Sequence, residues 1–182
     1  MIHVKFNKMK KYISIALLAF LTFSISSCTK DADVVGIESK LPALQLSSLG
    51  YQQSSPFTIS TTVLQLNFGA TSTGISTGAF KIEILNGTAA TSPVIKTVNF
   101  PSWNGKDDSV ITSNVPNGPH SISYTLQDTT YPTTSVYAGS ILLKLSALGL
   151  TAGGTYSVRA TALSADGTKT SVITQLSFFK TI

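Results

Sequence analysis

The sequence has one cysteine, two histidines and one tryptophan among its 182 residues, and only 12% of the residues are charged. A single cysteine excludes an intrachain disulfide framework and any multi-cysteine zinc or iron–sulfur site. The histidines, His3 and His120, stand too far apart to form a histidine-rich metal motif. We therefore expect no metal and no other cofactor. Apolar residues still make up 42% of the chain, which argues against an extended disordered protein.

The first 28 residues have the order of a secretory targeting signal. An apolar run from Ile13 to Ile25 follows four lysines, Lys5, Lys8, Lys10 and Lys11. As a helix this run would span about 20 Å, which is shorter than the ~30 Å hydrocarbon core of a bilayer. We therefore predict a signal peptide at 1–27 rather than a membrane-spanning helix. Met9 begins a complete signal of its own, so the true start is either Met1 or Met9.

The signal ends in Ile25-Ser26-Ser27-Cys28, where an aliphatic residue and two small residues precede the only cysteine. This order resembles the lipobox of bacterial lipoproteins. The resemblance implies cleavage between Ser27 and Cys28 and anchoring in membrane lipid through acyl chains on Cys28. Several acyl chains on one residue give stable anchoring because each buried methylene contributes about 0.8 kcal/mol. The alternative is an ordinary signal peptide with a chance cysteine near its cleavage site.

The residues after Cys28 indicate which of the two bacterial membranes would hold the protein. Thr29 occupies the position where an Asp favours inner-membrane retention in enteric bacteria. Thr29-Lys30-Asp31-Ala32-Asp33 resembles the export tract of Bacteroidetes-type surface lipoproteins, and a solvated spacer is the alternative. We therefore expect an outer-membrane lipoprotein, on the cell surface or the periplasmic face, with a flexible tether over 28–40 that includes Glu38.

The basic character of the whole chain belongs to the signal. The formal net charge is +5, from thirteen basic and eight acidic residues. Loss of the four signal lysines leaves nine basic against eight acidic side chains in the mature chain, a net charge of +1. Nucleic-acid binding therefore has no electrostatic support, and we expect no nucleic-acid partner.

From residue 41 onward, short apolar segments alternate with polar residues at a period of two. Five such segments stand out, at 64–68, 80–84, 122–126, 156–162 and 172–178. Turn-forming pairs such as Asn86-Gly87 and Asp166-Gly167 lie between them. This pattern is typical of half-buried antiparallel strands. We predict an all-β fold, an antiparallel sandwich of about 7–9 strands over 41–182.

The stretch 148–162, LGLTAGGTYSVRATA, resembles the corner between strands E and F and strand F itself in a fibronectin type III domain. The resemblance implies that the Tyr156 hydroxyl bonds back to the backbone and that Leu150 is the leucine that precedes the turn before this tyrosine. Residues 63–68, 80–84 and 171–179 resemble strands B, C and G in the expected order. The implied fold is an immunoglobulin-like sandwich, with residues 100–140 inserted where a short connection is usual.

The inserted segment is the candidate binding region, because long connections in compact domains are often functional. Trp103, Tyr131 and Tyr137 are the candidate ligand contacts, since exposed aromatic rings stack on sugars and anchor protein interfaces. The ligand is a glycan or a protein. In the competing interpretation, Trp103 caps the core of the sandwich.

Groups suited to catalysis are sparse. A hydrolase would need Asp107 or Asp108 to converge with His120, which follows Pro119 and is predicted to be a surface residue. Asn104, Asp107 and Asp108 could offer oxygen ligands to calcium, but their spacing fits no known calcium loop. We therefore expect no catalytic residues and no metal site.

Two tripeptides, Asp108-Ser109-Val110 and Asp128-Thr129-Thr130, resemble sites that Bacteroidetes-type bacteria O-glycosylate on exported proteins. Ser109 and Thr129 are therefore candidate modification sites. Together these patterns predict a non-enzymatic, lipid-anchored cell-envelope protein that presents an immunoglobulin-like binding or adhesion domain. The alternative is a glycan-binding accessory lipoprotein of a polysaccharide-uptake system.

Overall fold

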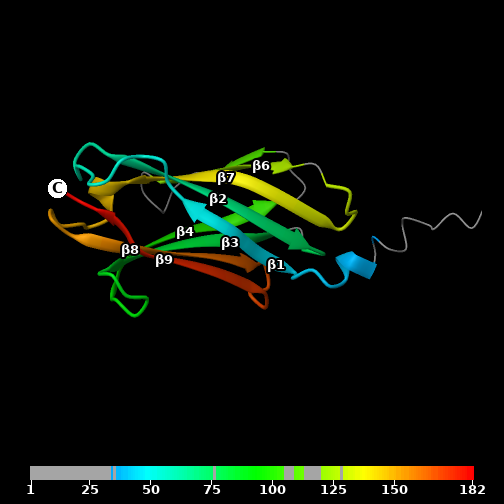
Figure 1. The fold of residues 1–182 in the computed structure, drawn as a ribbon. Helices are drawn as coiled ribbons and strands as arrows, with labels where there is room; N and C mark the ends of the chain where they lie inside the picture. Colours follow the sequence, from blue (N-terminus) through cyan, green and yellow to red (C-terminus); the bar gives the residue numbers. More distant parts are fainter. Residues whose placement is uncertain (1–33, 35, 76, 105–108, 113–119, 128) are drawn as a thin grey trace, which may run out of the picture. The chain divides into compact units, whose positions relative to one another are not determined.

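The computed structural model describes residues 34, 36–75, 77–104, 109–112, 120–127 and 129–182, with 101–104 and 109–112 described by their backbone alone. The chain divides into two compact units, 1–37 and 38–182. Within the first unit the described residues, Val34, Gly36 and Ile37, have helical backbone. The second unit is a β domain (Figure 1). Ser27 and Cys28 lie outside the described residues, so cleavage and lipidation remain predictions.

In the described part of the chain, nine strands form two antiparallel sheets that lie one over the other (Figure 1). The five-stranded sheet has the order β1 (Leu44–Gly50), β2 (Val63–Thr73), β7 (Thr134–Lys144), β6 (Ser121–Gln127) and β5 (Ser109–Thr112). The four-stranded sheet has the order β4 (Val94–Asn104), β3 (Thr77–Asn86), β8 (Thr155–Ser164) and β9 (Thr170–Lys180). One turn of 3-10 helix, η1 (Leu145–Ala147), follows β7.

This strand order confirms the predicted all-β immunoglobulin-like sandwich. The strand order β1-β2-β7-β6 matches the A-B-E-D sheet of that architecture, and the order β4-β3-β8-β9 matches its C′-C-F-G sheet. Strand β5 adds one strand beside β6. The predicted insertion at 100–140 contributes the end of β4, all of β5 and β6, and the first part of β7, so its described part is mostly sheet rather than loop.

The core lies between the two sheets and follows from the period-two pattern. Along β2, Leu64, Leu66 and Phe68 point inward and are at most 5% exposed, while Gln65 between them is exposed. The rings of Phe68 and Phe80 meet across the interface with centroids 5.2 Å apart. Burial of such side chains contributes about 1.5–3 kcal/mol each, which makes this interface the main source of stability.

Two hydrogen bonds join β1 to β9, which belongs to the other sheet, and a third joins Tyr51, just after β1, to β9. The Leu46 N–H donates to Ser171 Oγ at 2.8 Å, and Gln175 Nε2 donates to the Leu49 carbonyl at 3.1 Å. Farther along, the Tyr51 hydroxyl donates to the Phe178 carbonyl at 2.6 Å. These bonds occupy backbone groups that an edge strand would otherwise leave open to pairing with another chain.

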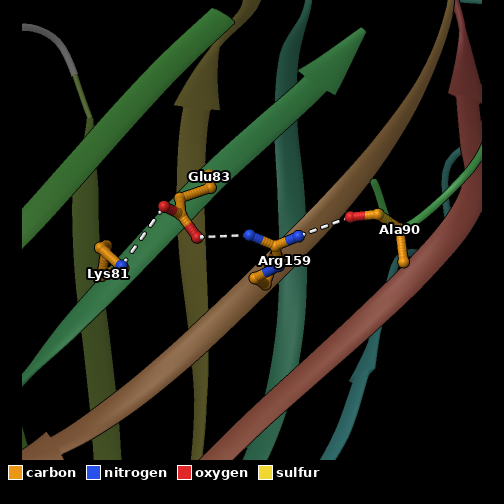
Figure 2. Close-up of polar contacts among 4 residues, drawn as sticks. All are labelled: Lys81, Glu83, Ala90 and Arg159. Carbon is orange, nitrogen blue, oxygen red and sulfur yellow. Dashed lines mark hydrogen bonds and ion pairs between the residues drawn. The ribbon is translucent and has the colours of Figure 1, made fainter. Parts of the chain in front are cut away.

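The outer face of the four-stranded sheet carries a line of charged groups, which Figure 2 shows in close-up. Glu83 on β3 forms ion pairs with Lys81 and with Arg159 of β8, each at 3.3 Å. Arg159 also donates to the Ala90 carbonyl at 2.6 Å, which attaches the β3–β4 connection to the sheet (Figure 2). Ion pairs near the surface contribute little to stability, about 0–1 kcal/mol each, but these pairs make this face polar and charged.

Candidate functional site

Three connections and the start of the domain meet at one end of the sandwich, which we call the loop end. It comprises 38–43, the β2–β3 connection at 74–76, the β6–β7 connection at 128–133 and the β8–β9 turn at 165–169, with residues 76 and 128 outside the described part. Main-chain bonds fasten these segments together. The Gly74 N–H donates to the Thr133 carbonyl at 2.9 Å, and the Ala165 N–H donates to the Thr77 carbonyl at 3.1 Å.

A depression of about 460 Å³ opens at the loop end. It is lined by the β2–β3 connection, the β8–β9 turn and Ala43. Its charged members are Asp166 and Lys169, and Ser164, Thr168 and Thr77 add hydroxyl groups. Its volume falls within the ~300–1,000 Å³ of small-molecule sites, but it is open to solvent rather than enclosed.

Asp166 is the carboxylate among the described residues that line the depression. Its Oδ1 accepts hydrogen bonds from the Ser164 hydroxyl and from the Thr168 N–H, and its Oδ2 accepts one from the Thr168 hydroxyl. These bonds, led by that from Ser164, lower the pKa of Asp166 to about 2. The group is therefore ionised at neutral pH and offers an acceptor for ligand hydroxyl or amino groups.

Glu38 fixes the point at which the chain joins the loop end. Its carboxylate accepts hydrogen bonds from the Thr133 N–H at 2.8 Å and the Thr134 hydroxyl at 2.7 Å. Burial raises the pKa of Glu38, but the bonds from Thr134 and Thr133 outweigh that effect and lower it below the usual value. The prediction that Glu38 belongs to the flexible tether is wrong, because only 4% of this residue is exposed.

The predicted aromatic contacts divide between the loop end and the core. Tyr131 lies in the β6–β7 connection, partly buried, and its N–H donates to Thr129 Oγ1 at 3.2 Å. Trp103 pairs with Gly78 through the backbone of β4, next to the loop end, and its side chain lies outside the described part. Tyr137 is only 4% exposed, and its hydroxyl bonds with that of Ser72 at 2.9 Å. This burial contradicts the predicted ligand contact of Tyr137.

Tyr137 is buried because its position on β7 directs it into the sandwich, where its ring meets that of Tyr124 edge-on with centroids 5.6 Å apart.

Of the two candidate glycosylation sites, Thr129 is exposed in the β6–β7 connection. Ser109 pairs with Thr125 through the backbone of β5, and its side chain is outside the described part. Asp107 and Asp108 are also outside it, so the convergence with His120 that a hydrolase would need has no described geometry.

The prediction of a surface histidine at position 120 is wrong. His120 is 0% exposed, and its Nδ1 accepts a hydrogen bond from the Lys144 N–H at 3.2 Å. Nε2, which carries the proton of this neutral tautomer, has no hydrogen-bond partner within the described part of the chain. Burial, assisted by the nearby charge of Lys96, lowers the pKa of His120 below its usual 6.5. The folded protein therefore holds this imidazole neutral.

We expect the free energy of unfolding to fall as the pH drops from about 7.5 to 5.5. The unfolded chain binds a proton at a pKa of about 6.5 and the folded chain resists it, so the loss is at most about 1.4 kcal/mol per pH unit. His120 is the one histidine of residues 28–182, the predicted mature chain. Urea unfolding at several pH values should show this slope in the wild type and a flat profile in His120→Gln. Equal slopes in the two proteins would contradict the prediction.

No protein-family model matches the sequence, and a search of curated proteins also gave no match. No helix in the described residues is long and apolar enough to cross a bilayer. Among the same residues, no group of three or more His, Cys, Asp or Glu side chains is placed to hold a metal ion.

Proposed function

We propose that this protein is a non-enzymatic lipoprotein of the outer membrane that presents an immunoglobulin-like binding or adhesion domain. The anchor is supported by the order of lysines, apolar run, small residues and Cys28 at the start of the chain. The domain attaches to its tether at Glu38, a buried residue hydrogen-bonded to Thr133 and Thr134. Because Glu38 is hydrogen-bonded to the sandwich, the predicted tether would end directly at the folded domain.

The depression at the loop end is the observation that supports the proposed binding role. Loops displayed by a rigid sandwich are a common place for recognition, because the sheets hold their ends in fixed positions. Here main-chain bonds join neighbouring loops, and the ionised Asp166 lies with Lys169 in an open concavity. These groups suit a ligand that offers hydroxyl, amino or carboxylate groups.

The anchor is tested by feeding cells an alkyne-bearing fatty acid and coupling the extracted protein to a fluorophore. We expect strong labelling of the wild type and complete loss of label in Cys28→Ala, because the resemblance places the acyl chains on that one residue. Ser26→Ala, which keeps a small residue before the cleavage site, is the matched control and should label normally. Equal labelling of Cys28→Ala and the wild type would refute the anchor.

A glycan-binding accessory role in polysaccharide uptake is the second candidate. It is favoured by the position of Tyr131, which lies at the loop end on the β6–β7 connection, and of Trp103, whose backbone lies in β4 next to it. Aromatic rings near hydroxyl and carboxylate groups form the usual surroundings of a bound sugar ring, with stacking on one side and hydrogen bonds at the edge. The burial of Tyr137 removes one of the three predicted contacts.

A further inference from the structure

The two outer faces of the sandwich differ in charge. The four-stranded sheet displays Lys81, Glu83 and Arg159 as an ion-paired line (Figure 2). In contrast, the five strands of the other sheet contain one charged residue, Lys144 at the end of β7. The outward positions of β2 instead carry carboxamides, at Gln65 and Asn67. A ligand for this second face would have to be recognised through neutral hydrogen bonds.

Four carboxamide side chains gather there around a groove of about 200 Å³: those of Gln52, Gln53, Gln65 and Asn67. Gln53 is fixed by two bonds to the backbone of β2. Its Nε2 donates to the Val63 carbonyl at 3.0 Å, and its Oε1 accepts from the Gln65 N–H at 2.8 Å. Strand β1 has already ended here, with its last pair at Gly50 and Asn67, so the Gln53 side chain takes the place of a strand along this edge of β2.

The other carboxamides of the groove keep much of their hydrogen-bonding capacity. Gln65 Nε2 donates to Asn67 Oδ1 at 3.2 Å, which aligns the two side chains. Each carboxamide offers two N–H donors and an oxygen with two lone pairs. Within the described part of the chain, Gln65 Oε1, Asn67 Nδ2 and the whole Gln52 amide therefore remain open to a ligand. Paired donors and acceptors of this kind match neighbouring hydroxyl groups, each of which both donates and accepts.

Apolar surface lies next to these amides. Leu142 of β7 pairs directly with Gln65 and is 37% exposed, and Val63 is 45% exposed two positions away on the same face of β2. The pyranose ring of a sugar has the matching character, with C–H groups on its faces and hydroxyl groups at its edge. The groove is smaller than the ~300–1,000 Å³ of pockets that enclose a whole small molecule, so it matches one ring of a longer chain.

We propose that the carboxamide groove (Gln52, Gln53, Gln65 and Asn67) binds a neutral saccharide. This site is separate from the loop end and goes beyond the function proposed above. Because the groove residues are uncharged, they offer no counter-ion to an acidic sugar or a phosphate, and that favours a neutral ligand over a charged one. Binding should therefore be insensitive to salt, since screening acts only between charges.

The test is isothermal titration of the detergent-solubilised mature lipoprotein with oligosaccharides. The probes are neutral oligomers of glucose, of mannose and of galactose, with an oligogalacturonate as the acidic counterpart. The groove variant is Gln65→Ala with Asn67→Ala, which removes the open amides but leaves both backbone bonds of Gln53 intact. Thr97→Ala, an exposed position on the outer face of β4, is the matched control. Tyr131→Ala reports separately on the loop end.

We expect at least one neutral oligosaccharide to bind the wild type and Thr97→Ala equally, and the groove variant at least about tenfold more weakly. That factor corresponds to the loss of one or two net hydrogen bonds. Unchanged binding on adding salt would support the proposal further. Loss of binding in Tyr131→Ala alone, binding of the acidic oligomer alone, or no binding of any neutral probe would each overturn it. Fatty-acid labelling of Cys28 is independent of all these results, so failure here leaves the anchor standing.

Discussion

Replacing Gly139 with alanine is expected to lower the free energy of unfolding by about 3 kcal/mol. Gly139 lies in the middle of β7, between β2 and β6, and pairs with Phe68 on one side and Tyr124 on the other. A Cβ atom built there would stand 2.7 Å from Phe68 Cε1 and 2.7 Å from Tyr124 Cβ, and it would also strike the Ser123 carbonyl oxygen. Backbone and packed aromatic rings on both neighbouring strands cannot all move aside, so the substitution strains the centre of the sheet.

Gly50→Ala is the matched control for this substitution. Gly50 ends β1, and an added Cβ would meet no atom within 4 Å. Its unfolding free energy should stay within about 0.5 kcal/mol of the wild type. Urea titrations followed by circular dichroism would measure both variants. If Gly139→Ala were as stable as Gly50→Ala, β2, β7 and β6 would not be closely packed around Gly139.

The second large effect is expected from Tyr156→Phe, at about 2 kcal/mol. Tyr156 is the second residue of β8 and is 1% exposed, and its ring stacks on that of Phe179 with centroids 5.4 Å apart. Its hydroxyl accepts a hydrogen bond from the Thr151 N–H at 2.7 Å. This is the backbone bond that the resemblance to a fibronectin type III corner implies. Phenylalanine keeps the ring in place but leaves the Thr151 N–H without its acceptor.

Tyr131→Phe removes the same hydroxyl from a tyrosine in the β6–β7 connection, whose side chain makes no hydrogen bond within the described residues. We expect a change within about 0.5 kcal/mol for this control. Chemical denaturation of the two variants in parallel gives the comparison. Similar midpoints for Tyr156→Phe and Tyr131→Phe would mean that the corner contributes nothing to stability.

Much of the β domain could be predicted from sequence because its strands have one buried face. The segments 64–68, 80–84, 122–126, 156–162 and 172–178 all fall within observed strands. Strands β4 and β7 have a less regular pattern. Pro101 lies within β4, which is tolerated because β4 is an edge strand, and Gly139 interrupts the side chains of β7. Neither strand carries the clean alternation by which the other five were found.

The candidate site was predictable only in part. The motif Ala165-Asp166-Gly167-Thr168 indicates a turn, and Gly167 adopts the left-handed φ of +69° that such a turn requires. Sequence does not reveal that this turn faces the β2–β3 connection across a depression, because the two segments are about ninety residues apart in the chain. The carboxamide groove was missed for a different reason: its residues are close in the chain, but Gln53 reaches β2 only because β1 ends early, and that depends on strand pairing.

Sequence alone is enough to predict the strand period, the corner at Tyr156 and the near-neutral charge of the predicted mature chain, because each depends on residues close together or on composition. The surroundings of Glu38, His120 and Tyr137 depend on the folded arrangement of the whole domain. All three are polar residues that local patterns place in a tether, on a surface or in a ligand contact, and all three are buried. A polar side chain can be buried where another segment supplies hydrogen bonds or packing, and that partner is chosen by strand register rather than by neighbouring sequence.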